Sequence, residues 1–182
     1  MHIFRYSVRI TLLALVLLVF IGGFMFFPDS SEPAADNSDA ATGAEAEEQV
    51  IAEYYAPLVP MRIGDVPVEA SLATTPAERQ QGLSDTPYLP AHVVKVFVFP
   101  EAKQYSFWMK DMQYPIDIIW VDAAADVVDI HEAVAPETYP ETFTPSQPAQ
   151  YVIETVAGFA AEQGITVGTE VDLPSILGLR TI

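Results

Sequence analysis

The apolar and polar residues divide the chain into three stretches of different character. Residues 10–27 are uncharged and almost wholly apolar, whereas residues 28–49 contain no aromatic or branched aliphatic side chain. Residues 59–173 alternate short apolar runs with turn-forming residues. The first pattern predicts a long apolar helix, the second a flexible segment, and the third a domain of short strands with few helices.

The apolar run predicts a single membrane-spanning helix. Its 18 residues, Ile10–Phe27, would form a helix of about 27 Å, which is close to the thickness of a hydrocarbon core. Arg5 and Arg9 precede it, so we expect residues 1–9 in the cytoplasm and the later residues outside it. The run ends in bulky residues, Phe24–Phe27, where a cleavable signal peptide needs small ones, and this favours a retained anchor.

The segment after the anchor is predicted to be an acidic, flexible linker, residues 28–58. Its first part, Pro28–Gln49, is rich in Ala, Ser, Asp and Glu. Such a composition buries too little apolar area to offset the entropy of ordering, so we expect an extended tether.

The third stretch predicts an α+β domain, dominated by β structure, over residues 59–173, with a tail at 174–182. Thr75, Pro76 and Glu78 form a capping-box signature for a short helix that would end at Gly82. A second helix is expected from Val156 to Gln163, and the following residues form either a closing strand or a turn at Gly168 with a strand after it. Strands are predicted at Met61–Ile63, Val66–Leu72, Val93–Phe99, Tyr105–Met109, Ile116–Val121, Val127–His131 and Tyr151–Glu154. Many short strands with one or two short helices indicate a compact, barrel-like sheet.

Composition excludes several classes of function. The net charge of −17 opposes nucleic-acid binding, which requires clustered cations. The chain has no cysteine, so disulfides, thiolate catalysis and cysteine-ligated metals are excluded. His131 with Asp129 is the best metal candidate, but two ligands do not make a site, and we expect no metal and no cofactor.

Four sequence blocks resemble one known family. They are ERQQGL (78–83), FVFPE (97–101), SFWMKDMQYPIDIIWVD (106–122) and YVIETVAGFAAEQGITVGTEV (151–171). In this order they are similar to the family named domain of unknown function 192 (DUF192), over roughly residues 61–173. The resemblance implies a compact β-rich domain, often exported or membrane-tethered, of unestablished biochemical function. The chain departs from the family pattern at Asp111, Met112 and Thr169, where the family usually has Asn, Thr and Asp.

Candidate chemistry centres on an ionisable residue inside an apolar strand. Asp117 lies within the run IDIIWV, and such a residue must be exposed, paired or functional. If Tyr105–Met109 and Ile116–Val121 are neighbouring strands, Lys110 is its natural partner, with Arg79 within reach and Trp108 beside it. Three interpretations remain open: a structural ion pair, a ligand pocket formed by Arg79, Trp108, Lys110 and Asp117, or acid–base catalysis.

The function predicted from these observations is a membrane-anchored, extracytoplasmic module that binds a small polar ligand. One alternative is a structural or interaction domain that meets an envelope protein. A second is a hydrolase that uses Asp117 with Lys110 or His131, although no nucleophile motif accompanies them. The expected partners are therefore the membrane, through residues 10–27, and a small ligand or envelope protein.

Overall fold

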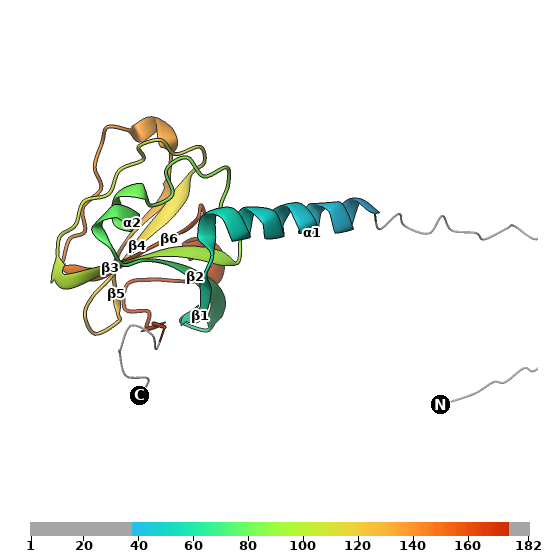
Figure 1. Ribbon diagram of the computed structural model, residues 1–182. Helices are drawn as coiled ribbons and strands as arrows, with labels where there is room; N and C mark the ends of the chain where they lie inside the picture. The colour runs from blue at the N-terminus through green and yellow to red at the C-terminus, as the bar shows by residue number, and fades with distance from the viewer. Residues whose placement is uncertain (1–37, 175–182) are drawn as a thin grey trace, which may run out of the picture. The chain divides into compact units, whose positions relative to one another are not determined.

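The structure, a computed structural model, describes residues 38–174 (Figure 1), and within them seven strands form one sheet. The strand order is β5-β4-β6-β3-β2-β1-β7. Neighbouring strands are antiparallel except β2 and β3, which are parallel and joined by a crossover containing helix α2. The strands are β1 (Leu58–Ile63), β2 (Val66–Ala73), β3 (Val93–Lys103), β4 (Ile116–Val121), β5 (Val127–Val134), β6 (Ala149–Val156) and β7 (Val171–Asp172).

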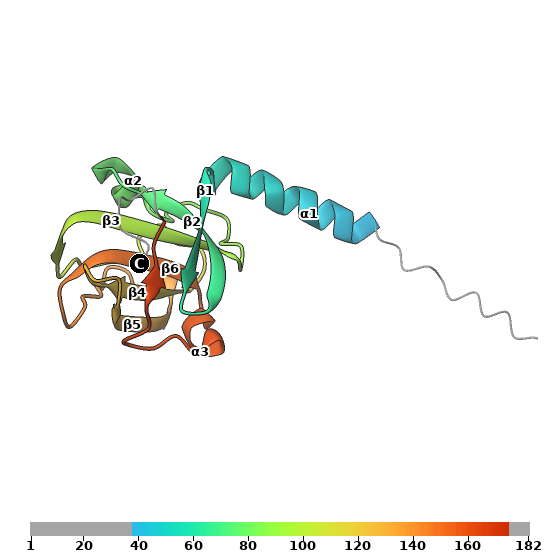
Figure 2. The ribbon, with the colours of Figure 1, turned by 90° about the horizontal axis from the view of Figure 1, so that it is seen from below.

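The sheet curls until its two edges meet at one end. On one side β7 pairs with β1, at Arg62↔Asp172 and Ile63↔Val171. On the other side, the segment leading into β7 bonds to the start of β5: the N–H of Val127 donates to the carbonyl of Thr169 (2.9 Å), and that of Gly168 to the carbonyl of Val127 (2.8 Å). The predicted β-dominated, barrel-like architecture is thus confirmed as a strongly curved sheet (Figure 2).

Alternation along the strands gives the sheet two buried faces. The enclosed face carries apolar side chains from every strand, among them Ile63, Val96, Ile119 and Ile153, and α3 packs against it through Phe159. The outer face of β3, β4 and β6 carries Phe97, Ile118, Trp120 and Val152. This outer face is covered by loops, including Leu83, Leu89 and Met109, so both faces of the central strands are buried.

The helices follow the sequence signals closely. α2 (Pro76–Gln81) has the predicted capping box, with the Thr75 hydroxyl accepting from the Glu78 N–H at 3.2 Å, and Gly82 is its C-cap. α3 (Phe159–Gln163) starts later than predicted because β6 continues to Val156 and Gly158, with φ 86°, forms the turn between them. A 3₁₀ turn, η2 (Pro136–Thr138), lies in the long β5–β6 connection.

Two conformational predictions are wrong. Tyr105–Met109 is a loop and not a strand: its ladder contact is a single bridge, Phe107↔Phe143, because β4 already has β5 and β6 as neighbours. Ser38–Val50, expected to be extended, forms helix α1, in which Ala, Glu and Gln are strong helix formers. Of the two alternatives for residues 165–173, the turn at Gly168 followed by a strand is confirmed.

The folded part also begins before the predicted boundary at residue 59. α1 runs into a short π-helical turn, η1 (Ile51–Tyr55), and the Tyr55 side chain is buried in the outer-face cluster. Its hydroxyl donates to the carbonyl of Tyr88 and lies 3.4 Å from the Tyr114 hydroxyl. Residues assigned to the linker by composition therefore contribute to the core.

Among residues 38–174, no helix is long and apolar enough to cross a membrane. The predicted anchor at residues 10–27 lies outside the described residues.

Candidate ligand pocket

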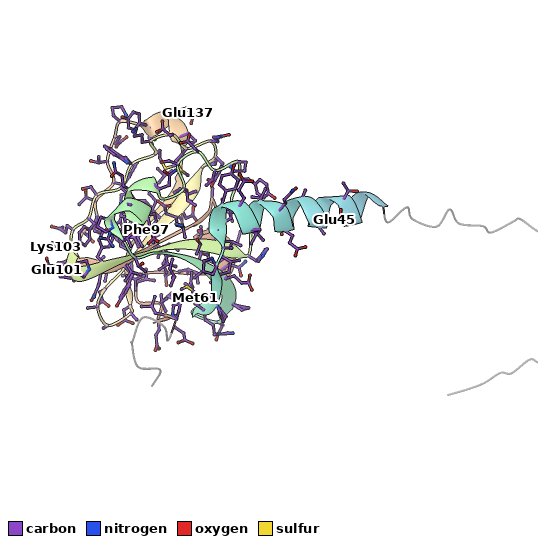
Figure 3. The ribbon with its side chains drawn as sticks, viewed as in Figure 1. Glu45, Met61, Phe97, Glu101, Lys103 and Glu137 are labelled. Carbon is purple, nitrogen blue, oxygen red and sulfur yellow. The ribbon has the colours of Figure 1, made fainter. Side chains whose placement is uncertain are left out.

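A pocket of about 220 Å³ opens on the outer face, between the end of α2 and the loop at residues 105–112. Its floor is formed by the buried side chains of Leu83, Phe97 and Glu154. Figure 3 shows Phe97 on β3 close to α2. The rest of the wall comes from Arg79, Gln80, Gln81, Gly82, Ser84, Phe99, Tyr105, Ser106, Phe107, Trp108 and Met112.

Hydrogen bonds to the polypeptide backbone hold the two walls together. The Ser84 hydroxyl donates to the carbonyl of Lys110 at 2.8 Å, and the N–H of Asp85 donates to the carbonyl of Asp111 at 2.9 Å. At the other end of the loop, the Trp120 indole N–H donates to the carbonyl of Tyr105 at 3.2 Å. The loop is thus fixed at both ends, and the pocket between it and α2 is preformed.

Aromatic rings pack on one another along one side of the pocket. Phe107 meets Phe97 edge-to-face with ring centroids 4.8 Å apart, and it meets Trp120 in the same way at 6.1 Å. Phe99 stacks on Tyr105 with centroids 3.6 Å apart. Such pairs stabilise one another beyond the burial of their area, and they give this side of the pocket a continuous aromatic surface.

Glu154 places a carboxyl group in this apolar setting. The residue is 5% exposed, and its Oε2 atom has no hydrogen-bond partner. Burial raises the pKa of Glu154 to about 8, although Lys95 acts in the opposite direction. A buried carboxyl oxygen without a partner costs free energy, so a group that binds there regains the lost hydrogen bond.

Lys95 lies opposite Glu154 across the β3–β6 ladder. It is 8% exposed, and its ammonium donates to the Ser71 hydroxyl on β2 at 3.1 Å. Burial lowers the pKa of Lys95, against the effect of Glu154. Ser71, Lys95 and Glu154 therefore form a polar row across three strands inside an otherwise apolar face.

A second, more polar hollow of about 310 Å³ adjoins the pocket. The two share Gln80, Gln81, Ser84 and Trp108, and the second hollow adds Ala77, Asp85, Lys110 and Asp111. Trp108 stands between them, 52% exposed, with its ring meeting Tyr139 edge-to-face at 6.0 Å. The exposed indole is thus available to both hollows.

Three of the four residues predicted from sequence lie around these hollows. Arg79 and Trp108 line the inner pocket, and Trp108 and Lys110 line the outer hollow. The Arg79 guanidinium donates to the carbonyls of Thr74 (2.5 Å) and Val98 (2.8 Å) and lies over the Phe99 ring at 5.1 Å. Arg79 therefore braces α2 against β3.

The fourth residue, Asp117, lies on the opposite face of the sheet. Its carboxylate is fully buried and accepts backbone N–H bonds from Ala133 (2.8 Å), Gly158 (3.0 Å) and Ala160 (2.9 Å). The predicted contacts of Asp117 with Lys110 and Arg79 are wrong, since Lys110 instead lies 3.6 Å from Asp111. The cause is the loop conformation at 105–112, with Asp111 at φ 58°, which removes the expected strand pairing.

His131, the best metal candidate in the sequence, packs through its ring. It lies 5.0 Å from the Trp120 ring and 5.5 Å from the Phe143 ring. The Asp129 carboxylate accepts the N–H groups of Ser146 and Ile130 (2.6 and 2.9 Å). Within the described part of the chain, no group of three or more His, Cys, Asp or Glu residues is placed to hold a metal ion.

The model of the DUF192 family, described as "Uncharacterized ACR", matches residues 59–173. The chain belongs to the DUF192 family. No curated protein matches it.

Two solved structures share the DUF192 domain's fold. One is a provisionally assigned transcription regulator from Sinorhizobium meliloti 1021, with a TM-score of 0.62 and 23% identity, covering 66% of this chain and 96% of that one. The other is a protein of unknown function from Novosphingobium aromaticivorans DSM 12444, with a TM-score of 0.61 and 27% identity, covering 64% of this chain and 85% of that one. These similarities support the fold. The role of the pocket is argued from its own geometry.

Sequence reasoning missed the two buried ionisable residues near the pocket of the DUF192 domain, Lys95 and Glu154. The signal was present, since Lys95 interrupts the run VVKVFVF and Glu154 the run YVIETV, as Asp117 interrupts IDIIWV. A search for ionisable residues inside all three apolar strands identifies Lys95 and Glu154 as well as Asp117. Only the strand register could show that Lys95 and Glu154 face each other while Asp117 lies on the other face.

Proposed function

We propose that this chain is a membrane-anchored, extracytoplasmic binding module whose DUF192 domain takes a small polar ligand in the outer-face pocket. The observation that carries the proposal is the partnerless carboxyl oxygen of Glu154 at the floor of a preformed, aromatic-lined pocket. Binding sites in proteins combine such apolar walls with a few convergent polar groups. The size of the pocket limits the buried part of the ligand to a small molecule or a terminal group.

The anchored topology rests on the sequence alone. Ile10–Phe27 follows Arg5 and Arg9, and 25 acidic residues all come after it. Protease added to intact spheroplasts should remove the DUF192 domain, whereas a cytoplasmic marker protein stays intact. Full protection of the domain until the membrane is lysed would contradict this topology.

Binding is tested with three probes that share a phenylethyl body and differ in one polar group. Phenethylammonium is a cation, hydrocinnamamide is neutral, and hydrocinnamate is an anion. Each is titrated at up to millimolar concentration into the ¹⁵N-labelled domain, starting upstream of Tyr55. We expect saturable shifts of the backbone amides of Leu83, Ser84 and Phe107 with at least one probe.

Two variants make the binding test specific. Trp108→Ala removes a wall of the pocket and should weaken binding, whereas Tyr54→Ala removes an aromatic side chain of similar exposure that does not line the pocket. Equal effects of the two changes, or no saturable shift with any of the probes, would refute the proposed function.

A further inference from the structure

The polar groups around the pocket differ in how far their hydrogen-bonding capacity is already used. The Arg79 guanidinium donates to the carbonyls of Thr74 and Val98, and the Ser84 hydroxyl donates to the carbonyl of Lys110. By contrast, Oε2 of Glu154 accepts no hydrogen bond. A ligand that brings a donor to the carboxyl group at the floor would therefore supply a hydrogen bond that this group lacks.

The walls favour a donor that carries positive charge. Five aromatic side chains line the same pocket: Phe97, Phe99, Tyr105, Phe107 and Trp108. The Phe99 ring is already in contact with the Arg79 guanidinium and stacked on Tyr105, so the other rings must supply the faces for a ligand. Aromatic faces attract organic cations, and the attraction grows when the cation leaves water. The chain has 25 acidic and 8 basic residues. The adjoining hollow is lined by two acids, Asp85 and Asp111, against one base, Lys110, so the approach to the pocket keeps a small excess of negative charge.

We propose that the pocket binds a small organic cation, a primary ammonium group on a short hydrocarbon body, with the ammonium donating to Glu154. This inference rests on the proposed function and specifies its ligand class. The hydrocarbon body would lie against Phe107 and Trp108, and any polar extension would reach the outer hollow past Trp108.

Lys95 does not already serve as this cation. Its ammonium donates to Ser71 and leaves Oε2 of Glu154 without a hydrogen bond, and Lys95 is not part of the pocket wall. The other titratable or charged groups around Glu154 are Tyr114, from the loop before β4, Tyr105 and Arg79 in the pocket wall, and Glu78 of α2, which acts on Lys95.

Binding of a cation should release a proton from Glu154. Because the pKa of Glu154 in the empty pocket is about 8, the carboxyl group is mostly protonated at neutral pH and must ionise to pair with an ammonium group. Affinity should then rise about tenfold between pH 6 and pH 7, where a primary amine stays fully charged. A neutral ligand that accepts a hydrogen bond from the protonated carboxyl would show no such rise.

The deciding experiment is calorimetry of the three phenylethyl probes at pH 6, 7 and 8, each in two buffers of different ionisation enthalpy. We expect phenethylammonium to bind most tightly, with the tenfold rise and the release of nearly one proton per ligand at about pH 6. Glu154→Gln should abolish both the preference for the cation and its pH dependence, whereas Glu132→Gln, an exposed acid outside the pocket, should leave both unchanged.

The other outcomes are distinguishable. Tighter binding of hydrocinnamamide or hydrocinnamate in the same pocket, or cation binding without proton release, would overturn the ligand class and leave the binding function standing. Failure of all three probes would overturn both. The pH and buffer comparison uses the unaltered domain, so it decides the question even if Glu154→Gln does not fold.

Discussion

The two faces of the sheet each bury a carboxyl group, and they treat it in opposite ways. On the enclosed face, Asp117 accepts three backbone N–H bonds from β5 and from the start of α3. On the outer face, Glu154 has a carboxyl oxygen without any partner, and burial raises its pKa to about 8. The carboxyl group of Asp117 is fully hydrogen-bonded within the fold, whereas that of Glu154 lacks a hydrogen bond and lies beside a pocket.

Burial of an acid does not by itself identify its role. The carboxyl group of Asp117 accepts backbone N–H groups from β5 and from the start of α3, so its two oxygens are hydrogen-bonded by the protein itself. Glu154 sits in a regular ladder whose backbone needs nothing from it. A satisfied carboxylate indicates a structural role, and an unsatisfied one beside a cavity indicates a site.

The largest expected effect is that of Asp117→Ala. Truncation leaves the buried N–H groups of Ala133, Gly158 and Ala160 without an acceptor, which should cost about 3–5 kcal/mol of unfolding free energy in urea titrations. Asp122→Ala is the matched control, since its carboxylate also accepts two backbone N–H groups, but in an exposed turn where water can replace it. Equal losses in the two variants would contradict the structural role of Asp117.

Tyr55→Ala tests how far the outer face extends beyond the family match at residue 59. The side chain is 1% exposed and its hydroxyl bonds to the backbone of Tyr88, so its removal should cost about 3–4 kcal/mol. The neighbouring Tyr54 is 40% exposed, so Tyr54→Ala should lower the free energy of unfolding by less than about 0.5 kcal/mol. If Tyr55→Ala were as mild as Tyr54→Ala in urea denaturation, residues 51–55 would not belong to the folded unit.

The pH dependence of stability separates the two acids further. Glu154 has a raised pKa in the folded state, so its protonated form favours folding, and this contribution is present at about pH 4 and is lost as pH rises toward 8. Relative to Glu154→Gln, the unaltered domain should therefore lose stability between pH 5 and 8, by an amount on the order of 3 kcal/mol. Parallel denaturation curves for the two proteins across this range would show that Glu154 is solvated in the folded state.

Among the variants of the buried acids and the pocket, Trp108→Ala should have the smallest effect on stability. Trp108 is 52% exposed at the mouth of the pocket, so its removal should change the unfolding free energy by less than about 1 kcal/mol while weakening ligand binding. Trp120 is fully buried on the same face, so Trp120→Ala should lower the free energy of unfolding by about 3–5 kcal/mol. Similar losses at both positions would make Trp108 a part of the core and not of a site.

Local signals in the sequence determined most of the elements. The strands β1, β2, β3, β4 and β6 follow from runs of branched and aromatic residues, because these side chains suit a pleated surface whatever its neighbours are. The helix at Pro76 and its end at Gly82 follow from capping chemistry within a few residues. The same residues carried the family resemblance. Arg79, Trp108 and Lys110 were assigned to a possible pocket by a different argument, as the expected neighbours of Asp117.

Pairing between distant segments was decided only by the tertiary structure. The loop at 105–112 has strand composition, but β4 is already flanked by β5 and β6, so no ladder was left for it. Asp117 was separated from Lys110 for this reason, and Lys95 was brought opposite Glu154 by a register that joins residues 59 positions apart. Composition likewise assigned Tyr55 to a linker. The residues adjacent to Tyr55 do not show that its hydroxyl contacts the carbonyl of Tyr88 and the hydroxyl of Tyr114 in the folded chain. Burial and register are properties of the whole chain, and they determine which buried acid receives hydrogen bonds from the protein and which has an oxygen without a partner.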